Sequence, residues 1–295
     1  MGLASLTMSE QATTLNLATA WEAVADAVGD QTVLAAGSRH TSWAEFDHRA
    51  ACLAGTLRSR GLDAGSKVAL YCYNGVEYPE AQYAAFKLRC VPANVNYRYL
   101  GDELAYILDN SDAEALFFDH SLADRVDAVR AGFPDLKALV QVGGGDTPSW
   151  AISYEDALAG PPMPRIERSG SDLWFLYTGG TTGMPKAVMW SHDSLFANMT
   201  KTFTSLGEEL PRTADEVAAT ATRVSTAGSR VRQLCAAPLM HGTSGLSSLA
   251  TLTHGGLIAT LEQGSFDPDE LWTVVESEKI TMVTIVGDAF ARPML

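Results

Sequence analysis

The stretch Tyr177–His192 constrains this chain more than any other, because its glycines, threonines and single lysine lie between two apolar runs. Residues 173–177 predict a buried strand that enters a loop, and residues 187–190 predict a strand that leaves it. Glycines in such a loop can adopt positive φ and let backbone N–H groups approach an anion closely. We therefore interpret the stretch as a phosphate-binding loop.

The polar side chains of this loop suit a nucleoside triphosphate. Threonine hydroxyls can bind phosphate oxygens or a hydrated metal ion, and a lysine ammonium can reach a terminal phosphate. The alternative is a Gly- and Thr-rich hairpin that binds no ligand. The candidate nucleotide-binding residues are Thr178, Gly179, Gly180, Thr181, Thr182, Gly183 and Lys186.

The spacing of these residues excludes a Walker loop, which ends in Gly-Lys-Ser/Thr. Met184 and Pro185 separate Gly183 from Lys186. Ala187 follows the lysine, where a Walker loop requires a metal-binding hydroxyl. If the loop binds a nucleotide, it therefore does so as a member of another class.

The segment Tyr177–Ala187 instead resembles the signature of the adenylate-forming (AMP-binding) superfamily, Tyr-Thr-Ser/Gly-Gly-Thr-Thr-Gly-x-Pro-Lys-Gly, with Ala187 in place of the final glycine. Further segments are similar to motifs of the fatty-acid and steroid side-chain acid CoA ligases of that superfamily. They are Phe86–Arg98, in which Arg89 and Cys90 replace an Ala-Gly pair, Pro238–Gly242 and Gly287–Pro293. The resemblance covers the whole chain and corresponds to the N-terminal part of such a ligase.

This resemblance implies a two-step reaction in which a carboxylic acid reacts with ATP to give an acyl-adenylate, and CoA then displaces AMP. By the same resemblance, residues 178–183 would surround the β- and γ-phosphates and Lys186 would neutralise their charge. Thr181 would lie beside the Mg²⁺ ion. The catalytic candidates are thus Lys186, Thr181 and His241.

His241 follows an apolar strand and precedes a predicted helix, which leaves two interpretations open. It can cap that helix, as isolated histidines commonly do. Alternatively, the resemblance places it beside the carboxylate of the acid, with Gly242 and Gly245 leaving space for the acyl group. Some long-chain relatives have an aromatic gate where Gly245 stands, so we expect a wide or ungated acyl tunnel.

The rest of the chain alternates apolar strands with amphipathic helices, which is typical of a parallel sheet covered by helices. We expect an α/β fold of stacked, mostly parallel sheets with helices on both faces. Loops rich in Gly, Pro and Ser suggest an N-terminal α/β subdomain at residues 1–165 and a loop-bearing subdomain at residues 166–295. The polar stretch 208–232 has weak periodicity and is expected to be a partly helical or mobile surface excursion.

Composition limits the choice of partners. A formal charge of -14 and the lack of any Lys/Arg cluster argue against a nucleic-acid partner. The four cysteines are scattered, as expected for free thiols in a reducing cytoplasm. The sequence shows neither a signal peptide nor a membrane span, so we expect a cytoplasmic protein without a transmembrane segment.

Several motifs of the resembled ligases have no counterpart in the chain, among them the Tyr-Gly-x-Thr-Glu motif, the ribose-binding Asp and the C-terminal catalytic Lys. We therefore expect an acyl-CoA synthetase by family whose 295 residues alone are inactive. The alternative is a short non-catalytic paralogue that binds a nucleotide or an acyl group or serves as a partner subunit. Apolar surface left uncovered in such a chain would favour homo-oligomers.

Overall fold

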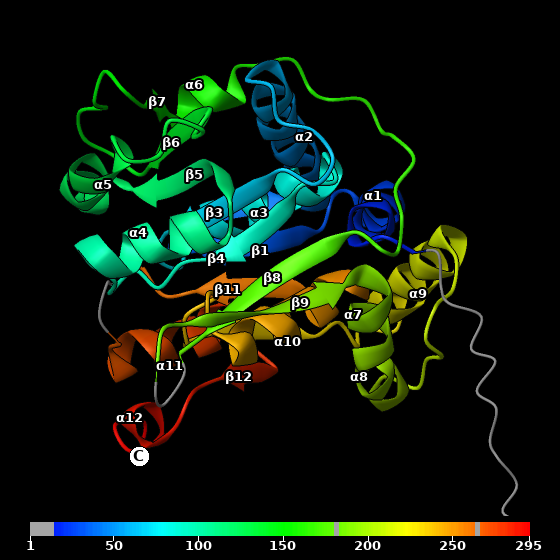
Figure 1. The fold of residues 1–295 in the computed structure, drawn as a ribbon. Coiled ribbons are helices and arrows are strands. Elements are labelled where there is room, and N and C mark those ends of the chain that lie inside the picture. The colour runs from blue at the N-terminus through cyan, green and yellow to red at the C-terminus, as the bar shows by residue number, and fades with distance from the viewer. Residues whose placement is uncertain (1–14, 180–182, 263–265) are drawn as a thin grey trace, which may run out of the picture.

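The computed structural model describes residues 15–179, 183–262 and 266–295, and helices and strands alternate along most of them (Figure 1). The helices are α1 (Leu17–Val28), α2 (Trp43–Ser59), α3 (Glu77–Lys87), α4 (Gly101–Asn110), η1 (His120–Leu122), α5 (Ala123–Arg130), α6 (Tyr154–Leu158), α7 (His192–Asn198), α8 (Thr200–Ser205), α9 (Ala214–Thr226), α10 (Gly242–Thr253), α11 (Pro268–Ser277) and α12 (Asp288–Ala291). The strands are β1 (Thr32–Ala36), β2 (Arg39–Ser42), β3 (Lys67–Tyr71), β4 (Val91–Asn94), β5 (Ala113–Asp119), β6 (Ala138–Val142), β7 (Ile152–Ser153), β8 (Leu173–Thr178), β9 (Lys186–Ser191), β10 (Arg232–Cys235), β11 (Leu257–Thr260) and β12 (Met282–Thr284).

The strands form two sheets. The first has the order β12-β10-β11-β1-β2, and the second has the order β7-β6-β5-β3-β4-β8-β9. Neighbouring strands are parallel except in the β1–β2 and β8–β9 pairs, which are antiparallel. The expected α/β fold with mostly parallel sheets is confirmed.

Alternation along β3 shows how the layers are stacked, because successive side chains of a strand point to opposite faces. Val68 and Leu70 join a buried cluster that includes residues of α1, α2, α3, α10 and the first sheet. Ala69 and Tyr71 face the other way and pack against α4 and α5. A third cluster packs α11 onto the outer face of the first sheet. The helices α1, α2, α3 and α10 therefore form a layer between the two sheets, and further helices cover both outer faces.

Buried ion pairs connect the elements of this central layer. The Lys87 ammonium, 3% exposed, donates to Glu22 at 2.8 Å and to Asp47 at 2.7 Å. Arg168, in the loop before β8, also donates to Glu22, at 2.8 Å. Removing one partner of such a buried pair leaves an uncompensated charge, which typically costs about 3–5 kcal/mol. These pairs therefore join α1, α2 and α3 to the segment that leads into the candidate loop.

Two helices begin at side-chain caps. The Asn16 side chain accepts from the Ala18 N–H at the start of α1. Ser42 and Glu45 form a capping box at the start of α2. Each side chain satisfies backbone N–H groups that have no partner within the helix.

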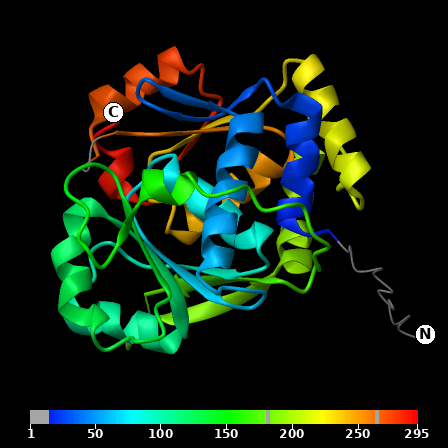
Figure 2. The same cartoon turned by 90° about the horizontal axis from the view of Figure 1, so that it is seen from above.

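The stretch 208–232 differs from the expected surface excursion. Its central part is α9, a 13-residue helix whose first turn is capped by the Thr213 side chain. Val217 and Ala221 are buried, and α9 lies alongside α1 (Figure 2). Frequent Ala and Thr residues hid this periodicity, since neither marks a buried face as clearly as a large aliphatic residue.

The predicted boundary at residue 165 falls in the loop between α6 and β8. Strands from both sides of it share each sheet, because β1 pairs with β11 and β4 pairs with β8. The division into subdomains at this point remains a prediction.

His192 is the first residue of α7, and its side chain points to another helix. Ser191 caps α7, whereas the buried Nδ1 of His192 accepts a hydrogen bond from the Leu17 N–H of α1 at 2.9 Å. Burial lowers the pKa of His192 to about 4, with a smaller opposing effect from Asp172. The neutral imidazole is therefore the form that the folded chain requires.

This burial predicts a pH dependence of stability. The pKa of His192 rises from about 4 in the folded chain to its ordinary 6.5 on unfolding, so its contribution is complete above pH 6.5 and is lost as the pH falls toward 4. The full difference corresponds to about 3 kcal/mol. His192→Gln should lower the unfolding free energy at pH 7.5 and flatten its fall between pH 7 and 4.5, as measured by urea unfolding. Replacing the exposed His120 by Gln is the control, and equal slopes in both variants would contradict the prediction.

Candidate functional site

The candidate nucleotide loop connects β8 to β9. Thr178, the last residue of β8, is paired with Lys186, the first residue of β9, so both stand at the mouth of the loop. Both residues are exposed, as are Gly179 and Gly183. A Cβ built on either glycine would meet no described atom within 4 Å, which leaves the loop backbone open to a ligand. Three predicted residues, Gly180, Thr181 and Thr182, lie outside the described residues.

Helix α4 holds both arms of this loop. The Tyr177 hydroxyl donates to Asn110 Oδ1 at 2.9 Å, and the Tyr106 hydroxyl donates to the Pro185 carbonyl at 3.1 Å. Burial raises the pKa of Tyr177 to about 12, which keeps its hydroxyl protonated as a donor. The loop is thus anchored at its two ends to one helix of the neighbouring layer.

His241 immediately precedes α10 and is exposed. Its Nδ1 accepts a hydrogen bond from the Thr243 N–H at 3.2 Å, which makes it the N-cap of α10. The capping interpretation therefore describes the geometry of His241. Nε2, the other ring nitrogen, has no recorded hydrogen bond to the described residues.

The two glycines that follow His241 lie against β8 rather than beside an open space. A Cβ on Gly242 would lie 3.1 Å from Leu176 Cδ2, and one on Gly245 would lie 3.3 Å from Trp174 Cη2. Both glycines thus permit close packing of α10 on β8. A Cβ on Gly245 would also lie 3.1 Å from the Leu239 carbonyl oxygen, so a larger residue there would require these neighbours to move. The expected acyl tunnel remains a prediction.

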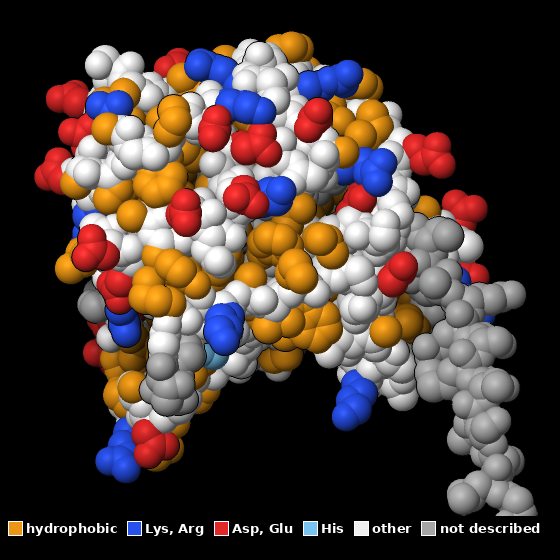
Figure 3. All heavy atoms as spheres, in the orientation of Figure 1, with side chains coloured by type: hydrophobic (Ala, Val, Ile, Leu, Met, Phe, Trp, Pro, Cys, Tyr) orange, Lys and Arg blue, Asp and Glu red, His pale blue; other side chains and the backbone are white. Residues whose placement is uncertain are grey.

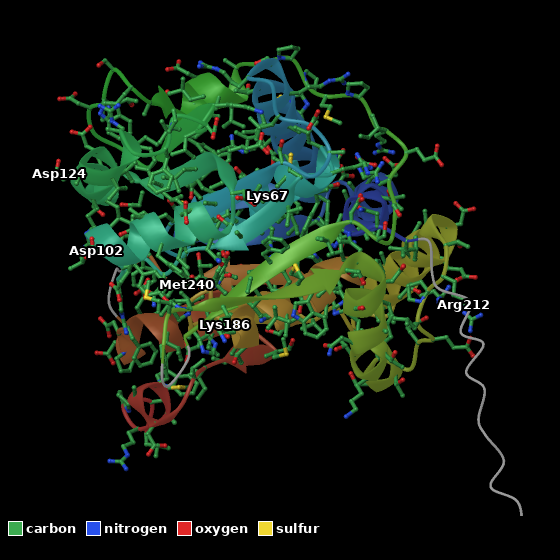
Figure 4. All side chains as sticks on the ribbon, in the orientation of Figure 1. Lys67, Asp102, Asp124, Lys186, Arg212 and Met240 are labelled. Atoms are coloured by element: carbon green, nitrogen blue, oxygen red, sulfur yellow. The ribbon has the colours of Figure 1, made fainter. Side chains whose placement is uncertain are left out.

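Two asparagines position the loop before His241. Asn94, at the end of β4, donates to the carbonyls of Tyr177 at 3.0 Å and Met240 at 2.7 Å, and its Oδ1 accepts from the Tyr177 N–H at 2.6 Å. Asn74 donates to the carbonyls of Cys235 and Ala237 and accepts from the Leu239 N–H. In the projection of Figure 4, the labelled Met240 and Lys186 appear next to each other.

Two departures from the expected motifs have clear structural settings. Ala187 is partly buried and packs against the cluster that contains Tyr177, so its methyl group contributes to the core. Arg89 has φ of 62°, and its guanidinium forms hydrogen bonds with both oxygens of Asp172.

No three His, Cys, Asp or Glu side chains of the described residues are grouped so that they could hold a metal ion. A Mg²⁺ ion commonly keeps several waters and is bound through phosphates and one or two protein groups. Among the described residues, the exposed Thr178 places a hydroxyl at the mouth of the loop, an oxygen group of the kind that binds Mg²⁺ or its waters.

A family model described as "AMP-binding enzyme" matches residues 21–294. The chain belongs to this family. The 3-oxocholest-4-en-26-oate–CoA ligase of Rhodococcus rhodochrous is 34% identical over 287 residues, which cover 95% of this chain and 51% of the relative. The medium-chain acyl-CoA ligase Mig of Mycobacterium avium is 33% identical over 307 residues, which cover 98% of this chain and 55% of the relative. The chain thus spans about half the length of these curated relatives.

Solved structures of AMP-binding enzymes share the fold. A long-chain-fatty-acid–CoA ligase from Archaeoglobus fulgidus superposes with a TM-score of 0.70 at 21% identity, over 92% of this chain and 51% of its own. A benzoate–CoA ligase from Burkholderia xenovorans superposes with a TM-score of 0.73 at 17% identity, over 91% of this chain and 50% of its own. Within the described part of this AMP-binding chain, no helix is both long and apolar enough to span a bilayer.

Sequence reasoning missed the residues that position the motifs. Asn94 forms hydrogen bonds with residues 83 and 146 positions away in the sequence. Tyr106 forms one with a residue 79 positions away. One signal was available for Asn94, because an amide that ends a buried apolar strand must find hydrogen-bond partners. For Tyr106, the chain offers many tyrosines and no pattern that distinguishes this one.

The anchoring of the loop by α4 predicts the effect of Tyr106→Phe. The variant loses one hydrogen bond, worth about 1 kcal/mol, and leaves the Pro185 arm less fixed before a nucleotide arrives. The dissociation constant for Mg·ATP should rise about fivefold, as measured by isothermal titration calorimetry. Tyr99→Phe is the matched control, because the structure records no partner for that hydroxyl within the described residues. Equal affinities of the two variants would contradict the prediction.

Proposed function

We propose that this chain forms the nucleotide- and acid-binding part of an ATP-dependent acyl-CoA ligase. The observation that carries the proposal is the pairing of Thr178 with Lys186 at the open mouth of the β8–β9 loop, beside the segment that carries His241. A cation, a hydroxyl and accessible backbone at one place suit the phosphates of ATP. Membership of the AMP-binding family supports the assignment.

In the proposed reaction, a carboxylate oxygen of the acid attacks the α-phosphorus of ATP. The acyl–O–P bond forms, the α–β phosphoanhydride bond breaks and pyrophosphate leaves. The CoA thiolate then attacks the acyl carbon, so that the thioester forms and AMP departs, while the thiol proton passes to solvent. Positioning and charge neutralisation supply most of the rate enhancement in such substitutions at phosphorus.

The residues proposed for this chemistry have separate tasks. Lys186 would neutralise the terminal phosphates, and residues 178–183 would donate backbone N–H groups to them. Thr181 is the proposed ligand of Mg²⁺, which when bound supplies charge neutralisation at the phosphates. His241 would face the carboxylate of the acid through Nε2, while its Nδ1 stays engaged with Thr243.

Anionic substrates must bind here to a protein with a formal charge of -14. Acidic and basic side chains are interspersed on the face seen in Figure 3, so no broad positive surface attracts a nucleotide there. Local groups at the loop mouth must therefore provide the attraction. We infer that binding depends strongly on Lys186 and on the loop backbone.

The proposed acid is a fatty acid or a steroid side-chain acid. The names of the two relatives above support these classes. In the sequence, the residues next to His241, Met240 and Gly242, offer no carboxylate to hold an α-amino group. A cytoplasmic location and self-association through the exposed Val188 and Met189 of edge strand β9 are further proposals.

A non-catalytic binding module is the second candidate. The observation that favours it is the filled space beside Gly242 and Gly245, where a ligase would need room for an acyl group. Immunoblotting of native cells separates the two. A band near twice 31.5 kDa supports part of a larger ligase, whereas a band at 31.5 kDa favours the binding module.

Lys186→Ala tests the nucleotide site. Losing a charge-assisted hydrogen bond of about 1.5–3 kcal/mol should weaken Mg·ATP binding about 10- to 100-fold, as measured by calorimetry at low salt. Lys201→Ala is the control, because Lys201 is an exposed residue of α8 with no ion pair in the described part of the chain. Unchanged affinity of Lys186→Ala would refute the assignment of the site.

Catalysis by the isolated chain is a separate question. We predict that the purified 295 residues bind Mg·ATP but give no fatty-acid-dependent exchange of pyrophosphate into ATP. The physical reason is that the groups expected to anchor the ribose and to hold the second metal contact have no counterpart in the chain. Radioactive exchange above the level of a Lys186→Ala control would show that the chain catalyses the first step.

A further inference from the structure

Asn94 forms hydrogen bonds with the backbone of both candidate motifs. On one side it forms two hydrogen bonds with Tyr177, next to the first residue of the nucleotide loop. On the other side it donates to the carbonyl of Met240, next to His241. Its side chain therefore joins β8 to the segment before α10.

The amide is well suited to this task. Asn94 is 5% exposed, and both N–H groups of its Nδ2 and one lone pair of its Oδ1 are used. A buried amide whose donors are both satisfied is costly to displace, because breaking either bond leaves an unpaired polar group. The distance between the Tyr177 and Met240 carbonyls is thus fixed by one rigid planar group.

We propose that Asn94 is a positioning residue that holds the nucleotide loop and His241 at a fixed separation, and so couples nucleotide binding to acid binding. This inference rests on the proposed function, in which ATP and the acid must meet at reacting distance. A displacement of Tyr177 on nucleotide binding would be transmitted through the amide to the Met240 carbonyl and to the neighbouring His241. Positioning of this kind governs rates strongly, because reacting atoms must approach within about 3–3.5 Å.

Asn74 provides a matched control. Its side chain makes three hydrogen bonds of the same kind, to Cys235, Ala237 and Leu239, so it supports the same segment before His241. It makes no recorded contact with β8. Replacing Asn74 should loosen one motif, whereas replacing Asn94 should loosen both and separate them.

The first experiment needs no ligand and compares Asn94→Leu with Asn74→Leu by hydrogen–deuterium exchange. In Asn94→Leu, amide exchange should rise at least tenfold both at Tyr177 and in residues 241–243. In Asn74→Leu, it should rise at Leu239 and stay unchanged at Tyr177. If Asn94→Leu affects only one of the two motifs, the link does not exist. Should that variant not fold, Asn94→Ala serves instead, because it removes all three hydrogen bonds without placing a larger apolar side chain in the buried site.

The second experiment measures the coupling between ligands by calorimetry. The probes are dodecanoate and Mg·α,β-methylene-ATP, an analogue that cannot form an adenylate. In the unaltered chain, the nucleotide should tighten dodecanoate binding at least fivefold, within the usual range of coupling between sites. This factor should fall below twofold in Asn94→Leu and persist in Asn74→Leu.

The two experiments separate the possible failures. A chain that binds neither probe refutes the proposed function, while the exchange result still decides whether Asn94 joins the motifs. Persistent coupling in Asn94→Leu, in a chain that binds both probes, refutes the positioning role alone. If Asn94 has only a structural role, as Asn74 does, both leucine variants should have a lower melting temperature and an unchanged coupling factor.

Discussion

Side chains at the two ends of β8 hold the strand that carries the candidate nucleotide loop. The backbone pairing of β4 with β8 is recorded at one position, Ala93 with Phe175. Before the strand, Asp172 accepts hydrogen bonds from Arg89 and Asn16. Near its end, the Asn94 amide takes over this task. The short β4–β8 pairing is thus supplemented by the ion pair between Arg89 and Asp172 and by the hydrogen bonds of the buried Asn94 amide. Both kinds of interaction are stronger than an exposed hydrogen bond between neutral groups.

The ion pair between Arg89 and Asp172 at the start of β8 explains the positive φ of Arg89. Arg89 adopts the left-handed conformation, which costs an L-residue about 1–2 kcal/mol. A glycine would take the same φ without strain but could not reach Asp172. The bidentate bonds from the guanidinium, 2.8 to 3.1 Å long, offset that cost and bring β8 into line with the end of α3. Arg89, which stands where the expected motif has Ala, therefore adds an ion pair that fixes the loop strand.

Local patterns in the sequence predicted the elements, and long-range contacts were beyond them. The Asn16 and Ser42 caps need only neighbouring residues, and the strand–loop–strand at Tyr177–His192 follows from its own glycines and apolar runs. The hydrogen bond that His192 accepts from the Leu17 N–H joins residues 175 positions apart in the sequence. No periodicity in the sequence predicts such a contact. The same holds for Asn94, because its partners are backbone groups that any residue could supply.

Packing of α10 on β8 is a further contact between the element that follows His241 and the strand that carries the nucleotide loop. Gly242 and Gly245 bring the helix so close that Leu176 and Trp174 fill the space beside them. Because the interior is closely packed, Leu176 and Trp174 fix the position of α10 relative to β8. Thr178 is the last residue of β8, and His241 caps the start of α10. This contact between helix and strand supports the arrangement in which the Asn94 amide joins the backbone of Tyr177 to that of Met240.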